Sequence, residues 1–132
     1  MLKSASDSEP IGASNRAILV DLSSNFLAEH TFYFSIVYFD EAIRLRYLIS
    51  PAVSTEDSKA RFWIDAEVRD DIGSQYYFMG GAYGLWNFAP CTDGVLTFSP
   101  LPPESAGLLS FTIRACRGNE TIDFSFSLLL KV

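Results

Sequence analysis

The clearest structural signal in this sequence lies in residues 60–70, which read ARFWIDAEVRD. Every second position in this stretch is apolar, through Phe62, Ile64, Ala66 and Val68. Side chains of a β-strand point alternately to its two faces, so a period of two predicts a strand with one buried face. Trp63 departs from the pattern, because it falls on the polar face among charged side chains.

The same alternation returns near the end of the chain, over residues 121–130. Five large apolar residues there alternate mostly with polar ones, and a register slip of one residue would turn all five toward water. Residues 108–116 form the strand before it, and residues 117–120 supply the turn. This region therefore predicts a strongly registered hairpin.

Residues 32–39 carry aromatic and β-branched side chains on both faces, which predicts a central strand that is covered on both sides. Asp40 and Glu41 are expected to form a tight turn, after which residues 42–50 pair with this strand as an antiparallel hairpin. Shorter runs of β-type residues predict further strands over residues 16–23, 75–79 and 95–99.

Gly80 and Gly81 are expected to end the strand that precedes them, as part of a strand-to-strand turn. Residues 83–88 are then expected to form a short strand or an aromatic-rich loop. The proline-rich residues 100–107 are expected to cross between two layers of the fold.

Eight or nine strands separated by frequent turns predict an all-β chain with at most one short helix. The long proline-rich connection favours a Greek-key antiparallel β-sandwich over an up-and-down barrel. Residues 1–15 are polar and aperiodic and are expected to be a flexible tail, whereas residues 16–132 are expected to form a single β-sandwich domain. The predicted core consists of Phe34, Ile36, Ile43, Leu45, Phe62, Ile64, Val68, Phe111, Ile113, Phe124, Phe126 and Leu128.

The 132 residues are 48% hydrophobic, which is enough to build a core without disulfides or metals. Their net charge of −6 argues against binding of nucleic acid or of a membrane surface, because both require clustered cations. No apolar run approaches the ~20 residues that span a bilayer. The start of the chain also lacks the apolar segment of a signal peptide, which predicts a cytoplasmic protein.

The residues that most often carry chemistry are few and scattered. Cys91 and Cys116 are expected to be reduced thiols, and a disulfide between facing strands is the alternative. His30 is the only histidine, and no serine or cysteine near it has the sequence context of a nucleophile. Structural zinc needs four ligands of these types, and the chain has three. We therefore expect no catalytic residues, no metal and no cofactor.

Acidic residues gather at Asp65, Glu67, Asp70 and Asp71. Asp65 and Glu67 share a strand face ~6–7 Å apart, a spacing that a glycosidase pair could use. The simpler interpretation is that they are solvated charges, because Arg69 alternates with them on the same face. In the turn, the carboxylate of Asp70 or Asp71 is expected to accept a hydrogen bond from a following backbone N–H.

Aromatic side chains are concentrated in residues 76–88. Exposed rings can stack on sugars, or they can anchor a protein partner through a large apolar area with a polar tip. The alternative is that about half of these rings lie in the core and the others cover one end of the sandwich. The candidate contact residues are Trp63, Tyr76, Tyr77, Tyr83 and Trp86.

Two motifs carry a resemblance to known proteins. Residues 68–76 read VRDDIGSQY, which fits the pattern V-x-D-D-x-G-x-x-Y, and residues 98–103 read FSPLPP, a shorter form of the pattern F-x-P-x-L-P-P. In this order they resemble a group of small uncharacterised bacterial proteins, many of them actinobacterial. The resemblance covers roughly residues 40–130. It implies an immunoglobulin-like β-sandwich and no particular catalytic or binding residue.

Three functions are compatible with these observations. The first is a non-catalytic interaction module that binds a protein partner or a second copy of itself. The second is a carbohydrate or small-ligand binding module that uses an exposed aromatic surface. The third is an acid/base hydrolase built on Asp65 and Glu67, which is the least favoured because no other catalytic residue accompanies them.

Overall fold

The computed structural model describes residues 16–26, 30–51, 62–85 and 91–130, with the backbone alone at Phe26 and residues 82–85. The tail predicted over residues 1–15 lies outside the described residues. The described part of the chain forms eight strands and no helix: β1 (Arg16–Phe26), β2 (His30–Phe39), β3 (Ile43–Ser50), β4 (Phe62–Asp70), β5 (Tyr77–Leu85), β6 (Thr92–Ser99), β7 (Leu108–Arg117) and β8 (Glu120–Leu129).

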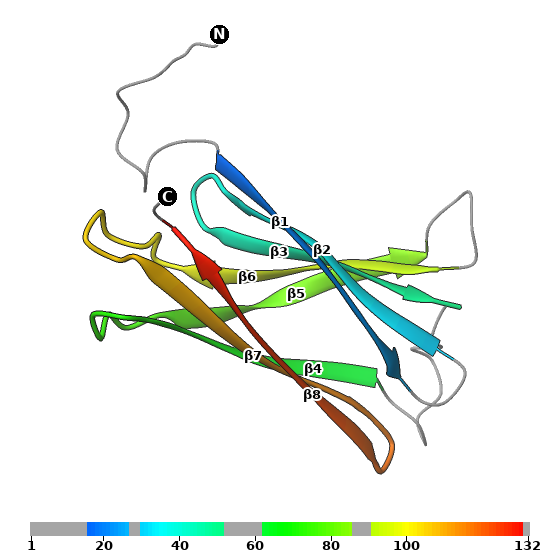
Figure 1. The fold of residues 1–132 in the computed structure, drawn as a ribbon. Helices are drawn as coiled ribbons and strands as arrows, with labels where there is room; N and C mark the ends of the chain where they lie inside the picture. Colours follow the sequence, from blue (N-terminus) through cyan, green and yellow to red (C-terminus); the bar gives the residue numbers. More distant parts are fainter. Residues whose placement is uncertain (1–15, 27–29, 52–61, 86–90, 131–132) are drawn as a thin grey trace, which may run out of the picture.

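The strands form a two-layered antiparallel β-sandwich, as predicted (Figure 1). One sheet has the order β1-β2-β3-β6-β5 and the other has the order β4-β7-β8. The chain crosses between them after β3, after β4 and after β6, which gives the Greek-key connections. The crossing predicted over residues 100–107 joins β6 to β7, and Leu130 N–H donates to its Gly107 carbonyl at 2.9 Å.

The core between the sheets is rich in phenylalanine. The rings of Phe34 on β2 and Phe124 on β8 meet edge to face, with centroids 5.1 Å apart. Phe111 on β7 stacks on Phe126 of β8 at 5.0 Å. These are favourable aromatic geometries. The predicted core residues lie in this layer with one exception, Ile36, although Ile64 and Phe126 are only half-buried.

The prediction that Ile36 belongs to the core is wrong, because a β-bulge shifts the alternation of β2. The pairing with β3 is regular on both sides of Ser35, which is the extra residue. Phe34 and Val37 therefore both face the core and are fully buried, whereas Ile36 lies half-buried on the outer side of the sheet. A single inserted residue reverses which positions of a strand are buried.

The prediction that Gly80 and Gly81 end a strand is also wrong. β5 runs through both glycines, so the strand expected over residues 75–79 continues instead of turning. A bulge lies between Phe78 and Gly81, and Gly80 has φ = +90° there. Glycine adopts that conformation at little cost. The pair therefore bends β5 within the sheet.

Two strands are longer than predicted, because β1 ends at Phe26 and β6 begins at Thr92. The hairpin of β2 and β3 is confirmed. Asp40 closes its turn, because Oδ1 accepts hydrogen bonds from Ala42 N–H at 3.1 Å and from Arg44 Nε at 3.0 Å.

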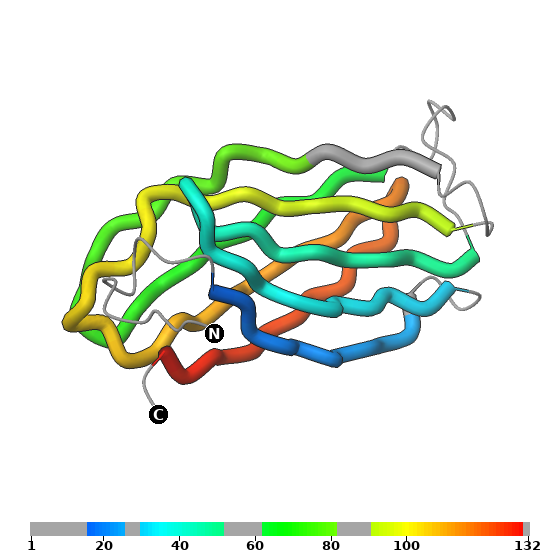
Figure 2. Tube along the Cα trace, turned by 90° about the horizontal axis from the view of Figure 1, so that it is seen from above, coloured from blue at the N-terminus to red at the C-terminus, as the bar shows by residue number. Residues whose placement is uncertain are grey.

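Within the described residues, the expectation that residues 32–39 are covered on both sides is met on one side. The inner side chains of β2 lie in the core, beneath the three-stranded sheet. Tyr33, Ile36 and Tyr38 point outward, are half-buried, and have no described layer over them. Figure 2 looks down on the outer side of the five-stranded sheet.

Candidate functional site

The five predicted contact residues do not form one surface. Trp63 projects from the outer side of the three-stranded sheet and is 47% exposed. Tyr77 is 57% exposed on the outer side of the other sheet, at the edge strand β5. Tyr76 is half-buried and packs against the core. The side chain of Tyr83 and the whole of Trp86 lie outside the described residues.

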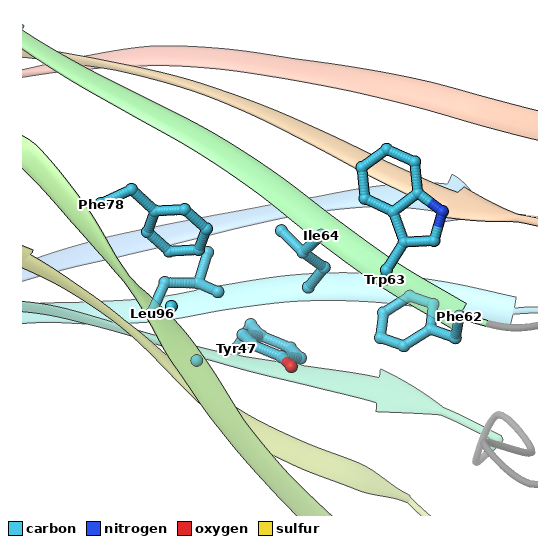
Figure 3. Close-up of a pocket in the computed structure, with 8 residues that line it drawn as sticks. Tyr47, Phe62, Trp63, Ile64, Phe78 and Leu96 are labelled. Atoms are coloured by element: carbon cyan, nitrogen blue, oxygen red, sulfur yellow. The ribbon is translucent and has the colours of Figure 1, made fainter.

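An apolar cleft of about 240 Å³ opens between β4 and β5, the edge strands on one side of the sandwich. Its lining is mostly aromatic and aliphatic, and consists of Tyr47, Phe62, Trp63, Ile64, Phe78, Gly80, Gly81 and Leu96. Figure 3 shows Phe62 and Trp63 leaving β4 in opposite directions, so that Trp63 points away from the other labelled side chains.

The cleft exists because β4 and β5 diverge from the turn that joins them (Figure 1). Among the described strands β4 pairs with β7 and β5 pairs with β6, so no ladder between described residues joins β4 to β5. Ile64 and Ala66 consequently stay half-buried although they face inward. The bulge of β5 adds to the opening, because its glycines bring no side chains into it.

The turn from β4 to β5 is organised by Asp70. Its Oδ1 accepts hydrogen bonds from the backbone N–H of Ile72 at 3.0 Å and of Ser74 at 2.9 Å. Its Oδ2 accepts a hydrogen bond from the Tyr76 hydroxyl at 2.8 Å. The predicted carboxylate-to-backbone bond is therefore confirmed. Gly73, in the same turn, has φ = +81°, which favours glycine.

These contacts change the acidity of both partners. Burial acts to raise the pKa of Asp70, but hydrogen bonds from Ser74, Tyr76 and Ile72 outweigh it and lower that pKa to about 2. Burial, and then the bond to Asp70, raise the pKa of Tyr76. Tyr76 thus holds the turn together, and its hydroxyl is already engaged within the fold.

Asp65 and Glu67 lie exposed on the outer side of the three-stranded sheet, in a shallow depression that they share with Arg114 and Asp123. Arg114 stands opposite Asp65 in the register, and its Nε donates to Asp123 Oδ1 at 2.9 Å. Glu67 forms an ion pair with Arg69 at 3.2 Å. This arrangement agrees with the interpretation of these acids as solvated charges among ion pairs.

The remaining reactive side chains are separate from one another. Cys91 and Cys116 are both buried free thiols, so the alternative of a disulfide between them is not realised. His30 opens β2, and its Nδ1 lies 2.7 Å from the carbonyl oxygen of Pro51. The described residues contain no group of three or more His, Cys, Asp or Glu side chains able to hold a metal ion.

The sequence-based choice of contact residues missed an apolar patch on the outer side of the five-stranded sheet, called the five-stranded face below. Leu19 is 70% exposed there, and it lies in one row with Ile36, Arg46 and Val95 across four strands. Tyr77 and Met79 extend the patch onto β5. Its central apolar members are Leu19, Tyr33, Ile36, Tyr38, Leu48 and Val95.

Most of the charge on the five-stranded face is neutralised within the face itself. The hydroxyl of Tyr33 donates to an aspartate, and this hydrogen bond raises the pKa of Tyr33. Two arginines bind aspartates from neighbouring positions. The pairs are Tyr33–Asp21 at 3.0 Å, Arg44–Asp40 at 3.0 Å and Arg46–Asp93 at 3.1 Å.

The outer side of the three-stranded sheet, called the three-stranded face below, is different in kind. Small hydroxyl side chains alternate there with the ion pairs Glu67–Arg69 and Arg114–Asp123, and Ser110 Oγ lies 2.9 Å from Ser127 Oγ. Trp63 and Leu129 are its exposed large apolar residues, and β4 and β8, at opposite edges of this sheet, carry them. They do not form a patch.

No family model, no curated protein and no solved structure matches the chain. The resemblance to small bacterial sandwich proteins therefore stays a prediction. None of the described segments forms a helix that could span a lipid bilayer.

Proposed function

We propose that this chain is a non-catalytic β-sandwich interaction module that contacts another protein through the five-stranded face. The observation that carries the proposal is the row across four strands in which Leu19, Ile36 and Val95 flank Arg46, whose charge is already paired. Contact surfaces between proteins are enriched in tyrosine and arginine, and their centres are poor in unpaired charge. Tyr33, Tyr38 and Arg46 give this face that composition.

We further infer that the scaffold is immunoglobulin-like. With β1 set aside, the order β2-β3-β6-β5 opposite β4-β7-β8 corresponds to the ABED and CFG sheets of a constant-type immunoglobulin domain. β1 then adds one strand at the edge and widens the five-stranded face. The buried free thiols of Cys91 and Cys116 support the proposal of a reducing, cytoplasmic location.

Site-specific photocrosslinking tests the proposed contact. A photoreactive phenylalanine analogue replaces Leu48 on the five-stranded face, or Thr112 on the three-stranded face, in cells that make the protein. We expect a covalent adduct with another polypeptide from position 48 and little from position 112. Absence of any adduct from position 48, or equal labelling from the two faces, would contradict the proposed function.

A second candidate function is binding of a small apolar ligand in the cleft between β4 and β5. The observation that favours it is the aromatic lining from Tyr47, Phe62 and Phe78, since ligand sites are predominantly apolar and concave. A fluorescent apolar dye should bind the wild-type protein, and Ile64→Trp, at a half-buried lining position, should weaken its binding by filling the cleft. Unchanged dye binding in that variant would exclude the cleft.

The described rings give less support to a carbohydrate platform. Such a platform needs several coplanar exposed rings, whereas Trp63 and Tyr77 lie on opposite outer sides of the sandwich. The hydroxyl of Tyr76 is bound to Asp70.

A further inference from the structure

We propose that the protein bound by the five-stranded face is a second copy of this chain. The chain would then form a symmetric dimer in which two five-stranded faces pack against each other. This inference rests on the proposed function, because it names the occupant of the same face. Sheets that pack face to face lie ~10 Å apart and interdigitate their outward side chains.

The first argument is that β2 is apolar on both sides but covered on one. Phe34 and Val37 are buried beneath the three-stranded sheet, while Tyr33, Ile36 and Tyr38 have no described layer over them. Strands with apolar side chains on both faces are typically buried on both. A second sheet on the outer side supplies the cover that the sequence pattern requires.

The second argument is the size of the face. Five strands spaced ~4.8 Å apart and overlapping over about eight residues span roughly 600 Å² in projection. Pleating and side chains make the accessible surface larger than this projection. A standard protein interface buries ~800 Å² on each partner, so this face alone is large enough for a stable dimer.

The third argument is electrostatic. Arg44 and Arg46 balance two of the face's aspartates, Asp40 and Asp93, so only Asp21 leaves a net charge of −1 there. The whole chain carries −6. Two copies that meet through this face therefore bring little of the chain's negative charge together.

Both strongly exposed leucines provide a matched test. Leu19 is 70% exposed on the five-stranded face, and Leu129 is 71% exposed on the three-stranded face. Sedimentation equilibrium of the purified full chain should give twice its 14.7 kDa mass. We expect Leu19→Lys to weaken the dimer by roughly 10-fold or more, which is ~1.4 kcal/mol, and Leu129→Lys to leave the dissociation constant unchanged.

Leu48→Lys, on the middle strand of the five-stranded face, should abolish the dimer, with circular dichroism as the check on folding. If that variant fails to fold, Leu19→Lys decides the matter, because its side chain lies outside the core. A chain that stays monomeric at millimolar concentration would overturn the inference, as would a dimer that is insensitive to Leu19→Lys. A monomer that still gives an adduct from position 48 would overturn the second copy while leaving the proposed function in place.

Discussion

The two outer faces of the sandwich each expose one leucine to the same degree, yet the surroundings of these leucines differ. Leu19 continues a row of apolar and arginine side chains across the five-stranded sheet, whereas Leu129 pairs with Leu108 at the end of β8 and has serines beside it. Single exposed apolar residues are normal on protein surfaces, and contiguous patches mark contact sites. The comparison teaches that contiguity, and not exposure, distinguishes the two faces.

The difference has a simple physical origin. Inward positions of both sheets are constrained by one shared core, so they look alike on β2 and on β8. Outward positions are free of that constraint, and their composition reflects what each face meets. We interpret the three-stranded face as solvent-facing and the five-stranded face as covered.

The largest loss of folding stability is expected from substitutions that test which residues of β2 face the core and which face outward. Phe34→Ala should destabilise the fold by about 3–5 kcal/mol, because it leaves a cavity in the aromatic core. Ile36→Ala should cost less than about 1.5 kcal/mol, because Ile36 lies beyond the bulge, on the outer side of the sheet and outside the core. Urea denaturation at low protein concentration measures both. Equal costs would place Ile36 in the core and shrink the proposed contact face.

Bulges are also where sequence reasoning failed. The strands over residues 60–70 and 121–130 could be predicted because their alternation is uninterrupted, and both pair in regular register with β7. The shift at Ser35 and the bend at Gly80 and Gly81 leave no such mark, because an inserted residue changes the facing without changing composition. Hydrogen-bond registers fix these features, and they appear only in the folded chain.

The candidate surfaces were partly visible in the sequence. Apolar residues on both sides of β2 were apparent, but a strand buried in its own fold and a strand buried by a partner give the same pattern. The cleft left no trace, because it depends on how far β4 and β5 diverge in space. The contact between Asp70 and its turn was predictable, since aspartate binds following N–H groups locally.

The next largest loss of stability is expected at the turn from β4 to β5, which joins the two sheets. The pKa of Asp70 is lowered to about 2 in the folded protein, below the ~3.9 of an unfolded chain. The ionised carboxylate of Asp70 therefore stabilises the folded protein fully above about pH 4, and this stabilisation is lost as pH falls toward 2. Allowing for solvent screening, Asp70→Asn should cost about 1–2 kcal/mol at pH 7.

Denaturation curves collected from pH 7 to pH 2 check this prediction. The stability gap between the wild-type protein and Asp70→Asn should close as the pH approaches 2. The matched change Asp71→Asn should have less effect, because Asp71 accepts a single exposed hydrogen bond, from Gly107 N–H at 3.0 Å. A pH-independent gap would show that the charge of Asp70 does not hold the turn.

A smaller effect, on the dissociation constant of the dimer, should distinguish the ion pairs of the two faces. Arg46→Gln would leave Asp93 unpaired inside the proposed contact and should weaken the dimer several-fold, by about 1 kcal/mol. Arg114→Gln removes the corresponding pair with Asp123 from the three-stranded face and should not change the dissociation constant. Analytical ultracentrifugation compares them. A stronger effect of Arg114→Gln would reverse the roles assigned to the faces.

The smallest effect is expected from the three-stranded face itself. Thr112→Lys places a charge on an exposed sheet position among polar neighbours. It should change the free energy of unfolding by no more than about 0.5 kcal/mol, as measured by thermal unfolding. A large loss of stability would mean that this face is also covered, and the contrast between the faces would disappear.

Hydroxyl-radical footprinting at increasing protein concentration tests the central claim most directly. Oxidation of Leu19, Tyr33 and Tyr38 should fall as copies associate, whereas oxidation of Trp63 and Leu129 should stay constant. Protection of Trp63 and Leu129 instead, or constant oxidation of both faces at every concentration, would contradict the assignment of the five-stranded face as the contact surface.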